Sequence, residues 1–331
     1  MHFEGFAGNE EAKRTLSACV DGGRFPHALL LEGPQGSGRR TLARLIARAA
    51  VCTAPDGEEK PCGRCSGCVK AAAGSHPDIS EAGGDGSARS FHIAEVRELR
   101  DSAYILPNEA PYRALILAGA NNMTEQAQNA LLKVLEEPPR HVVFILTCEN
   151  RAQMLATIQS RAICIPLTGV PADEAAEVLR RRLPGRGEEE LRRAAAVFGG
   201  VIGQALQGLE DGSFQKVLEL APAMAAAAVA PDELTFLRLT ARLEKDKDLA
   251  DGVLSAMALI FRDALVGGSA GGTRLSTSPE TADTLAKALS RARLLRLMEE
   301  IEALQRARLR NMNHSLFLTL LCARLRAAAG K

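Results

Sequence analysis

Tryptophan is absent from the 331-residue chain, and tyrosine occurs only twice. Proteins that hold single-stranded nucleic acid commonly stack its bases on aromatic side chains, so that mode of binding has few residues to use here. An excess of charge is also lacking, because 41 lysines and arginines nearly balance 40 aspartates and glutamates, for a net charge of +1. A chain that grips DNA mainly by itself would usually be more basic, since phosphate neutralisation supplies much of such affinity.

No apolar stretch of the sequence is long enough to span a membrane, and the opening residues MHFEGF do not form a signal-peptide pattern. We therefore expect a cytoplasmic protein with no membrane partner. In that reducing compartment the eight cysteines would not form a disulfide framework. Because 46% of the residues are hydrophobic, a chain of this length can build the cores of two or three domains.

A glycine-rich turn between a buried strand and a helix dominates the first part of the chain. The apolar run 28–31 predicts the strand, and apolar periodicity after residue 41 predicts the helix. The spacing from Gly33 to Gly38 fits G-x-x-x-x-G-K-[ST], a loop whose backbone N–H groups surround phosphate at a helix N-terminus. The residues of this degenerate nucleotide site are Gly33, Gly36, Gly38, Arg39, Arg40 and Thr41.

The positions that make such a loop catalytic differ from the motif. Arg39 replaces the lysine, and Arg40 replaces the residue whose hydroxyl would bind Mg²⁺. A second departure lies after the strand expected at Ala114–Ala118, where residues 119–121 include no carboxylate to hold the metal. The sequence thus predicts a nucleotide cradle without turnover, and an active ATPase in which Arg39 replaces lysine is the alternative.

Four cysteines are spaced as metal ligands. Two C-x-x-C steps share Cys65 within Cys62–Cys68, and Cys52 supplies a fourth thiolate. Four thiolates suit tetrahedral Zn²⁺ in a closed structural site, and an iron–sulfur cluster is the chemical alternative. We predict a structural zinc module at about residues 50–70, held by Cys52, Cys62, Cys65 and Cys68. The other cysteines have apolar neighbours and are predicted to be core residues, namely Cys19, Cys148, Cys164 and Cys322.

The pattern changes from α/β to all-helical along the chain. Asn9 is predicted to cap a helix that runs to Val20, and further strands are expected at 142–146 and 163–165. From Pro171 onward only helices are predicted, including one helix over Pro279–Leu309 and an alanine-rich helix interrupted by Pro222. Arginines of this part could touch DNA, although a solvated helix face is the simpler interpretation. They are Arg291, Arg293, Arg296, Arg306, Arg308 and Arg310.

Several motifs occur in an order that resembles the bacterial clamp-loader AAA+ family, the delta-prime and gamma/tau subunits of DNA polymerase III. They are FEGFAGN near the start, PHALLLEGP at the loop, the four cysteines, HPD, NALLKVLEEPP at 129–139 and Ser160-Arg161. The resemblance implies an α/β AAA+ domain over residues 1–167, with a P-loop NTPase-like parallel sheet and an inserted zinc module. A helical lid over 168–210 and an all-α collar over 211–331 would follow.

Departures from the family pattern favour its delta-prime branch. Gamma/tau is the ATPase motor of the family, whereas delta-prime is a stator that has the motor's fold without its turnover. Besides Arg39, Arg40 and the uncharged strand end, this chain has Gln204 where the family places a nucleotide-reading arginine.

The resemblance also implies one positive role. The family's Ser-Arg-Cys motif supplies an arginine finger to ATP on the neighbouring subunit, and Ser160-Arg161-Ala162 matches its first two positions. Arg161 would then stabilise phosphate charge in trans, with ATP and Mg²⁺ held by the neighbour.

The partners implied by the resemblance are the gamma/tau subunits, the delta subunit and, through the assembled loader, the sliding clamp and primed DNA. A zinc-dependent nucleic-acid-binding regulator unrelated to replication is the alternative of a different class.

Overall fold

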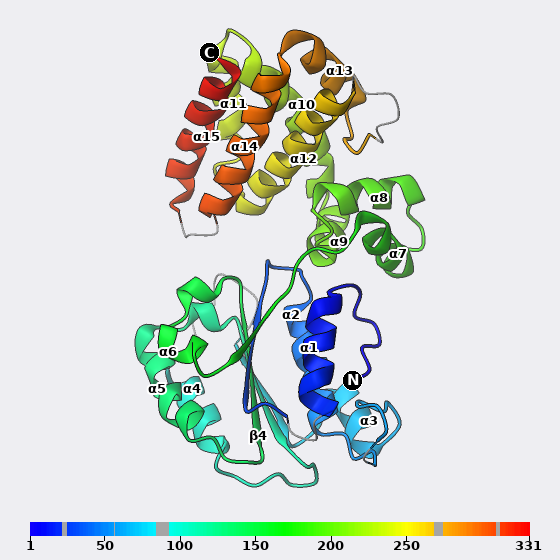
Figure 1. Ribbon diagram of the computed structural model, residues 1–331, viewed down its shortest axis with the longest axis vertical. Helices are drawn as coiled ribbons and strands as arrows, with labels where there is room; N and C mark the ends of the chain where they lie inside the picture. Colours follow the sequence, from blue (N-terminus) through cyan, green and yellow to red (C-terminus); the bar gives the residue numbers. More distant parts are fainter. Residues whose placement is uncertain (22–24, 56, 84–92, 268–273, 309–311) are drawn as a thin grey trace. The chain divides into compact units, whose positions relative to one another are not determined.

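The computed structural model describes residues 1–21, 25–55, 57–83, 93–267, 274–308 and 312–331. The chain divides into two compact units, Met1–Gly169 and Val170–Lys331 (Figure 1). The described strands all belong to the first unit, and the described second unit is helical. In the described parts of the chain, no helix combines the length and apolarity needed to cross a bilayer.

Five parallel strands form the sheet of the first unit, in the order β2-β3-β4-β1-β5. Their bounds are β1 Ala28–Glu32, β2 Ile79–Gly83, β3 Arg113–Ala118, β4 Val142–Cys148 and β5 Ile163–Pro166. Both β3 and β4 are buried along their whole length, as expected of parallel strands covered on both faces. Because the strands are parallel, their starts share one edge of the sheet, here called the amino edge, and their ends share the opposite carboxyl edge.

Helices cover both faces of this sheet (Figure 1). On one face α1 and α2 pack against alternate strand residues such as Ile116, while α4, α5 and α6 pack on the other face with Leu115. The helix bounds are α1 Glu10–Asp21, α2 Arg39–Ala50, α3 Ser66–Ala72, α4 Ile93–Ser102, α5 Glu125–Glu136 and α6 Ala156–Gln159. The alternation follows from the period of two in a strand, which sends successive side chains to opposite faces.

The prediction that Asn9 caps α1 is wrong. Asn9 has a left-handed backbone with φ 54°, and its side chain pairs with Thr168 instead. Its Nδ2 donates to the Thr168 carbonyl at 3.2 Å, and its Oδ1 accepts from the Thr168 N–H at 2.9 Å. Both polar groups of one residue thereby join the start of the chain to the segment that leaves β5.

One hydrophobic core joins the helices of the second unit. The bounds are α7 Ala172–Arg182, α8 Glu188–Val197, α9 Ile202–Asp211, α10 Ser213–Val229, α11 Glu233–Ala241, α12 Lys247–Val266, α13 Pro279–Ala288, α14 Arg291–Arg308 and α15 His314–Ala329. The predicted lid and collar both lie in this unit, and their division near residue 210 stays a prediction.

Two predictions about these helices are wrong. Within 279–308 the chain forms two helices, because Leu289 is extended (φ −120°, ψ 144°) and the Ser290 carbonyl accepts the N–H groups of Arg293 and Leu294 in the first turn of α14. Pro222 does not interrupt α10, which continues through it. The neighbouring Ala221 and Met224 are fully buried, so packing of the apolar face outweighs the missing backbone hydrogen bond.

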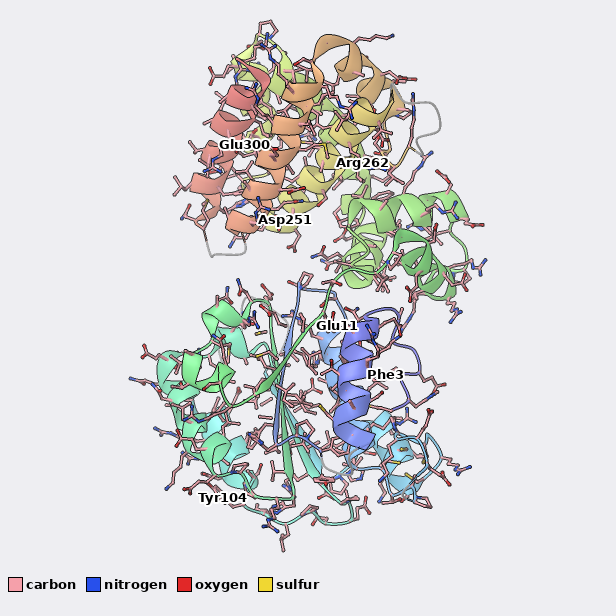
Figure 2. All side chains as sticks on the ribbon, viewed as in Figure 1. Phe3, Glu11, Tyr104, Asp251, Arg262 and Glu300 are labelled. Atoms are coloured by element: carbon pink, nitrogen blue, oxygen red, sulfur yellow. The ribbon has the colours of Figure 1, made fainter. Side chains whose placement is uncertain are left out.

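Arg308 serves a structural role, in contrast to the predicted solvated face. Its Nε donates to Asp251 (labelled in Figure 2) at 2.6 Å, and its NH2 donates to the Lys247 carbonyl at 2.8 Å. These bonds fasten the end of α14 to the start of α12. Of the other arginines named above, Arg310 lies outside the described residues.

A buried carboxylate organises the chain that enters β3. Asp78 is fully buried and accepts the backbone N–H groups of Asn108, Glu109 and Ala110 at 2.6, 3.0 and 3.1 Å. Burial alone raises the pKa of Asp78, but these N–H groups outweigh it, and the pKa lies below its ordinary value. The ionised carboxylate therefore stabilises this segment.

We expect the Asp78 carboxylate to make stability depend on pH. Its folded pKa is below the unfolded one, so its contribution is complete above the unfolded pKa and is lost as pH falls through the folded pKa. The substitution Asp78→Asn should cost about 2 kcal/mol at pH 7 and flatten this acid dependence. Urea unfolding at a series of pH values from 7 to 3 measures both effects. If the free energy of unfolding falls equally steeply with pH in the wild type and the variant, the assignment is wrong.

A glycine pair after α8 offers a matched test of packing in the second unit. Both Gly199 (φ 59°) and Gly200 (φ 74°) are left-handed. A Cβ atom on Gly200 would lie 1.7 Å from the Val170 carbonyl oxygen, whereas a Cβ on Gly199 would meet nothing within 4 Å.

The two glycines should therefore respond differently to alanine. Gly199→Ala should cost about 1–2 kcal/mol, the strain of a left-handed residue. Gly200→Ala should cost more than about 4 kcal/mol, since backbone must move as well. Urea titration would give the free energy of unfolding of each variant. If both variants lose about the same stability relative to the wild type, the backbone can move at Gly200 and the predicted clash is wrong.

Candidate functional site

The glycine-rich loop joins β1 to α2 at the carboxyl edge of the sheet. Gly36 (φ 83°) and Gly38 (φ 88°) adopt the left-handed conformation that favours glycine. Gly33 is constrained by contact instead, because a Cβ there would lie 2.6 Å from the Leu167 carbonyl oxygen. The loop turns tightly into α2, which begins at Arg39.

The arginines that follow the loop are directed to carboxylates of their own chain. The Arg39 side chain is 3% exposed, and its NH2 atom lies 3.9 Å from a Glu149 oxygen. Arg40 donates through Nε to Glu81 on β2 at 2.5 Å, and Arg44 donates to the same carboxylate at 2.9 Å. Two guanidinium groups thus share one carboxylate. Arg40 thus supplies no hydroxyl at the position where the loop motif has one.

The strand ends beside the loop are joined by neutral hydrogen bonds. The Gly119 N–H, just after β3, donates to Thr147 Oγ1 at 2.9 Å. The Glu149 N–H, just after β4, donates to Asn121 Oδ1 at 3.1 Å. Thr147 is buried, and its oxygen is engaged between strands. These contacts occupy the place where a hydrolase would have a metal-binding carboxylate after β3.

Thr41, the remaining loop residue predicted from the sequence, and Gln204, where the resemblance expects a nucleotide-reading arginine, belong to different units. Thr41 is exposed in the first turn of α2, and Gln204 is half-buried on α9 of the second unit. Neither has a contact that assigns it a role.

Four thiols meet around one point, as the sequence predicted for a metal site. The Sγ atoms of Cys52, Cys62, Cys65 and Cys68 all lie within 4.8 Å of one another. The Cys62–Cys68 and Cys52–Cys65 separations are 4.0 and 3.9 Å. A tetrahedral ion with bonds of about 2.3 Å separates its sulfur ligands by about 3.8 Å, whereas a disulfide needs about 2.05 Å. The cluster therefore fits one four-coordinate metal ion and no disulfide.

Backbone groups already favour thiolate at part of this cluster. The N–H groups of Cys62 and Cys68 each point at a cluster sulfur, at 3.4 Å. Burial raises the pKa of Cys68 to about 12. At Cys65, burial also raises the pKa, but N–H groups of Cys68 and Thr53 outweigh it and lower the pKa to about 6. A bound cation would favour thiolate at all four positions.

The remaining cysteines divide between core and surface. Cys148 and Cys322 are buried, as predicted for core residues. Cys164 is partly buried but packs against the core on the α5 face of the sheet, in line with the prediction, whereas Cys19 is partly buried and belongs to none of the described cores.

Ser160 and Arg161 lie between α6 and β5, at the amino edge of the sheet. Arg161 NH2 lies 2.9 Å from a Glu136 oxygen, and its NH1 donates to the Thr157 carbonyl at 2.8 Å. The Ser160 hydroxyl donates to the same carbonyl at 3.1 Å. The side chains of Arg161 and Glu136 are 32% and 48% exposed. Exposed pairs of this kind are worth about 0.2–1 kcal/mol, so Arg161 can exchange its partner.

The fold separates Arg161 from the glycine-rich loop of its own chain. Leu29 of β1 pairs with Ile163, two residues after Arg161, while the loop follows the other end of β1. A strand of four residues spans about 13 Å. Arg161 and the loop therefore occupy opposite edges of one sheet, and they cannot reach the same phosphate group.

Sequence reasoning missed three residues that shape these sites. Buried Gln128 donates to the carbonyls of Met123 and Gln153 at 3.4 Å and accepts the Leu155 N–H at 2.8 Å, which ties α5 to the segment before α6. Glu136 pairs with Arg161, and the Phe6 ring lies 2.9 Å from where a Cβ on Gly38 would be. No local spacing signals such contacts, because each joins segments distant in sequence.

Comparisons with known proteins point to one family. A family model described as DNA polymerase III, delta subunit, matches residues 8–171. The Escherichia coli DNA polymerase III subunit delta-prime is 30% identical over 250 residues, which cover 76% of this chain and 73% of that protein. The Mycobacterium tuberculosis subunit gamma/tau is 35% identical over 179 residues, covering 54% of this chain and 31% of that protein. This chain thus spans about a third of its gamma/tau relatives.

One solved structure that matches nearly the whole chain is also of a DNA polymerase III subunit-related protein. It is a gamma subunit-related protein of Thermotoga maritima, with 18% identity and a TM-score of 0.37, and the match covers 98% of this chain and 100% of that one.

We expect the purified chain to carry about one zinc ion, because four thiolates around one point suit tetrahedral Zn²⁺. Cys65→Ser should release the ion and lower the melting temperature, while Cys19→Ser, outside the cluster, should retain it. Elemental analysis for zinc and iron, with thermal melting before and after chelation, measures both effects. Stoichiometric iron with visible absorbance would instead identify an iron–sulfur cluster.

Proposed function

The chain belongs to the clamp-loader family of DNA polymerase III subunits, and from that membership we propose that it is a stator subunit of the delta-prime type. In this role it joins gamma/tau and delta in the loader that places the sliding clamp on primed DNA in the cytoplasm. It contributes Arg161 to ATP held by the neighbouring gamma/tau subunit, and it does not turn over ATP itself.

Absence of turnover is supported at two separate places in the site. Arg40 replaces the hydroxyl residue that would bind Mg²⁺, and its guanidinium is paired with Glu81. The end of β3 has Gly119 and Asn121 in hydrogen bonds with β4 and no carboxylate. Either change alone would weaken metal binding, and together they remove both the metal ligand and the group that polarises water.

The observation that carries the proposal is the position of Arg161. It lies at the amino edge, a strand's length from its own loop, with a third of its side chain exposed. An arginine so placed can act only on phosphate that another molecule brings to it. Its Glu136 partner is itself half exposed, so a phosphate can displace that carboxylate at little cost.

The four-cysteine cluster serves as a structural zinc module in this proposal. Cys52 lies just beyond α2 and Cys65 caps α3, so one ion would join the end of the loop helix to this short helix. The ion would hold the segment together and would take no part in chemistry.

Two other functions make different predictions. A gamma/tau-like motor would hydrolyse ATP through Arg39, but that side chain is buried beside Glu149. A zinc-dependent DNA-binding regulator would bind DNA alone with steep salt dependence, which the net charge of +1 does not favour.

Arg161→Ala should lower the rate of ATP hydrolysis at the site that this chain completes in the reassembled loader by at least about tenfold. The reason is that an arginine finger typically raises the rate of hydrolysis by more than this factor. The measurement is steady-state hydrolysis with gamma/tau, delta, clamp and primed DNA. Arg97→Ala, an exposed arginine on α4, is the matched control and should keep the wild-type rate.

Gel filtration should show that the Arg161→Ala ring still assembles. If the variant ring hydrolyses ATP at the wild-type rate, Arg161 is structural. If the isolated wild-type chain hydrolyses ATP, the stator assignment is wrong and the chain is a motor.

A further inference from the structure

Arg161 divides its donor groups between two kinds of acceptor. Its NH1 atom donates to the Thr157 carbonyl at 2.8 Å and to the Ser160 hydroxyl at 3.3 Å, both of them close to it in the chain. Its NH2 atom lies 2.9 Å from an oxygen of Glu136 on α5. Within the described residues, Nε of Arg161 has no partner. The guanidinium group would therefore stay attached through NH1 if the Glu136 carboxylate left.

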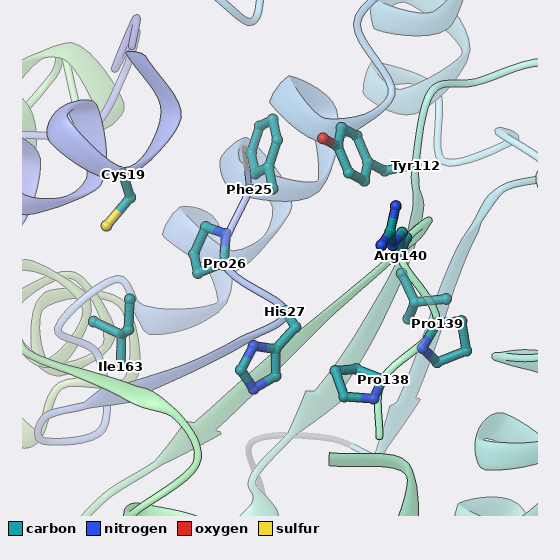
Figure 3. Close-up of a pocket in the computed structure, with 10 residues that line it drawn as sticks. Cys19, Phe25, Pro26, His27, Tyr112, Pro138, Pro139, Arg140 and Ile163 are labelled. Atoms are coloured by element: carbon teal, nitrogen blue, oxygen red, sulfur yellow. The ribbon is translucent and has the colours of Figure 1, made fainter. Parts of the chain in front are cut away.

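Glu136 occupies a helix end that does not favour a carboxylate. It is the last residue of α5, and Glu137 is the C-cap. The C-terminus of a helix carries a partial negative charge, which disfavours acidic side chains. Pro138 and Pro139 follow directly, in the segment that leads to β4, and their rings stiffen the backbone (Figure 3). In the described parts of the chain, Arg161 is the only cation that pairs with Glu136, so the arginine rather than the helix accounts for this charge.

The carboxylate of Glu136 and a phosphate group compete for the same donors. Both present anionic oxygens that accept N–H bonds from a guanidinium group. The side chains of Arg161 and Glu136 are 32% and 48% exposed, so water screens their attraction. Exposed pairs of this kind change an equilibrium constant by up to about fivefold. The pair is therefore strong enough to hold Arg161 for much of the time, and weak enough for a phosphate group to displace it.

We propose that Glu136 is an internal competitor for the phosphate group that Arg161 binds. In the isolated chain it occupies NH2 of Arg161 and neutralises the charge of the finger. When the neighbouring subunit presents ATP, the carboxylate leaves, NH2 and Nε bind phosphate oxygens, and NH1 keeps the Thr157 carbonyl. This inference concerns regulation of the proposed finger and rests on the proposed function, because it requires that Arg161 meets ATP in trans.

Chemical modification tests the pair in the isolated full chain. Phenylglyoxal reacts with guanidinium groups, and a paired carboxylate slows that reaction. Glu136→Gln keeps the size of the side chain and removes its charge, so it should speed the modification of Arg161 by about twofold to fivefold, measured by peptide mass spectrometry. Glu137→Gln makes the same change at the next residue and should leave the rate unchanged. Arg97, exposed on α4 and without a partner in the described residues, is the internal standard.

The competition itself is measured by titration with gamma/tau. A non-hydrolysable ATP analogue should tighten the binding of this chain to gamma/tau, because Arg161 gains a phosphate partner. In Glu136→Gln this gain in affinity should be about twofold to fivefold larger than in the wild type, because no carboxylate has to leave. Glu137→Gln should show the wild-type gain, and Arg161→Ala should lose most of it. Circular dichroism would confirm that the two glutamate variants, both at exposed positions, still fold.

The outcomes separate this inference from the proposed function. If Glu136→Gln both speeds the modification of Arg161 and enlarges the gain with the analogue, Glu136 is a competitor. If either measurement matches the wild type while Arg161→Ala loses the gain, the finger stands and this inference is wrong. A smaller gain in Glu136→Gln would show that the carboxylate orients Arg161 toward phosphate, which also overturns the inference. If Arg161→Ala keeps the wild-type gain, the arginine does not meet the nucleotide, and the proposed finger fails together with its competitor.

Discussion

The common direction of five strands is the constraint on which the sites of the first unit depend. Parallel pairing gathers all strand starts at one edge and all strand ends at the other. The glycine-rich loop must then lie at the carboxyl edge, and Arg161, which precedes β5, must lie at the amino edge. A single chain of this topology therefore keeps its glycine-rich loop, the predicted phosphate cradle, apart from Arg161. A ring of such chains would bring the cradle of one to the arginine of the next.

The environment of each arginine decides what it can still bind. Arg39 is almost fully buried near Glu149, so removing that carboxylate would leave a buried charge short of compensation. Arg161 has a comparable partner in Glu136, but at the surface, where water screens the pair and replaces either partner. Two Arg–Glu pairs thus have opposite consequences. Arg39 is held in the interior of its own chain, whereas Arg161 is exposed enough to exchange its partner.

The sequence predicted the parts of this structure that local patterns determine. The strands at Ala114–Ala118 and 142–146 and the meeting of the four cysteines are confirmed, since each depends on periodicity or close spacing. The break at Leu289–Ser290 was missed because neither glycine nor proline marks it. The pairing of Asn9 with Thr168 and of Arg161 with Glu136 could not be predicted, because both join distant segments whose approach only the folded sheet sets.

The segment that leads to Arg161 is fastened by the buried side chain of Gln128. Gln128 uses both ends of its amide to hold the backbone on either side of Met154, where the chain turns toward α6. A substitution of Gln128 that left these buried backbone groups without a hydrogen-bond partner would destabilise the fold by about 1–3 kcal/mol for each group. Arg161 pairs with Glu136 and with the Thr157 carbonyl at the surface, while Gln128 fixes the segment just before α6, the helix that precedes Arg161. A partly exposed arginine can thus be well placed and still be able to change partners.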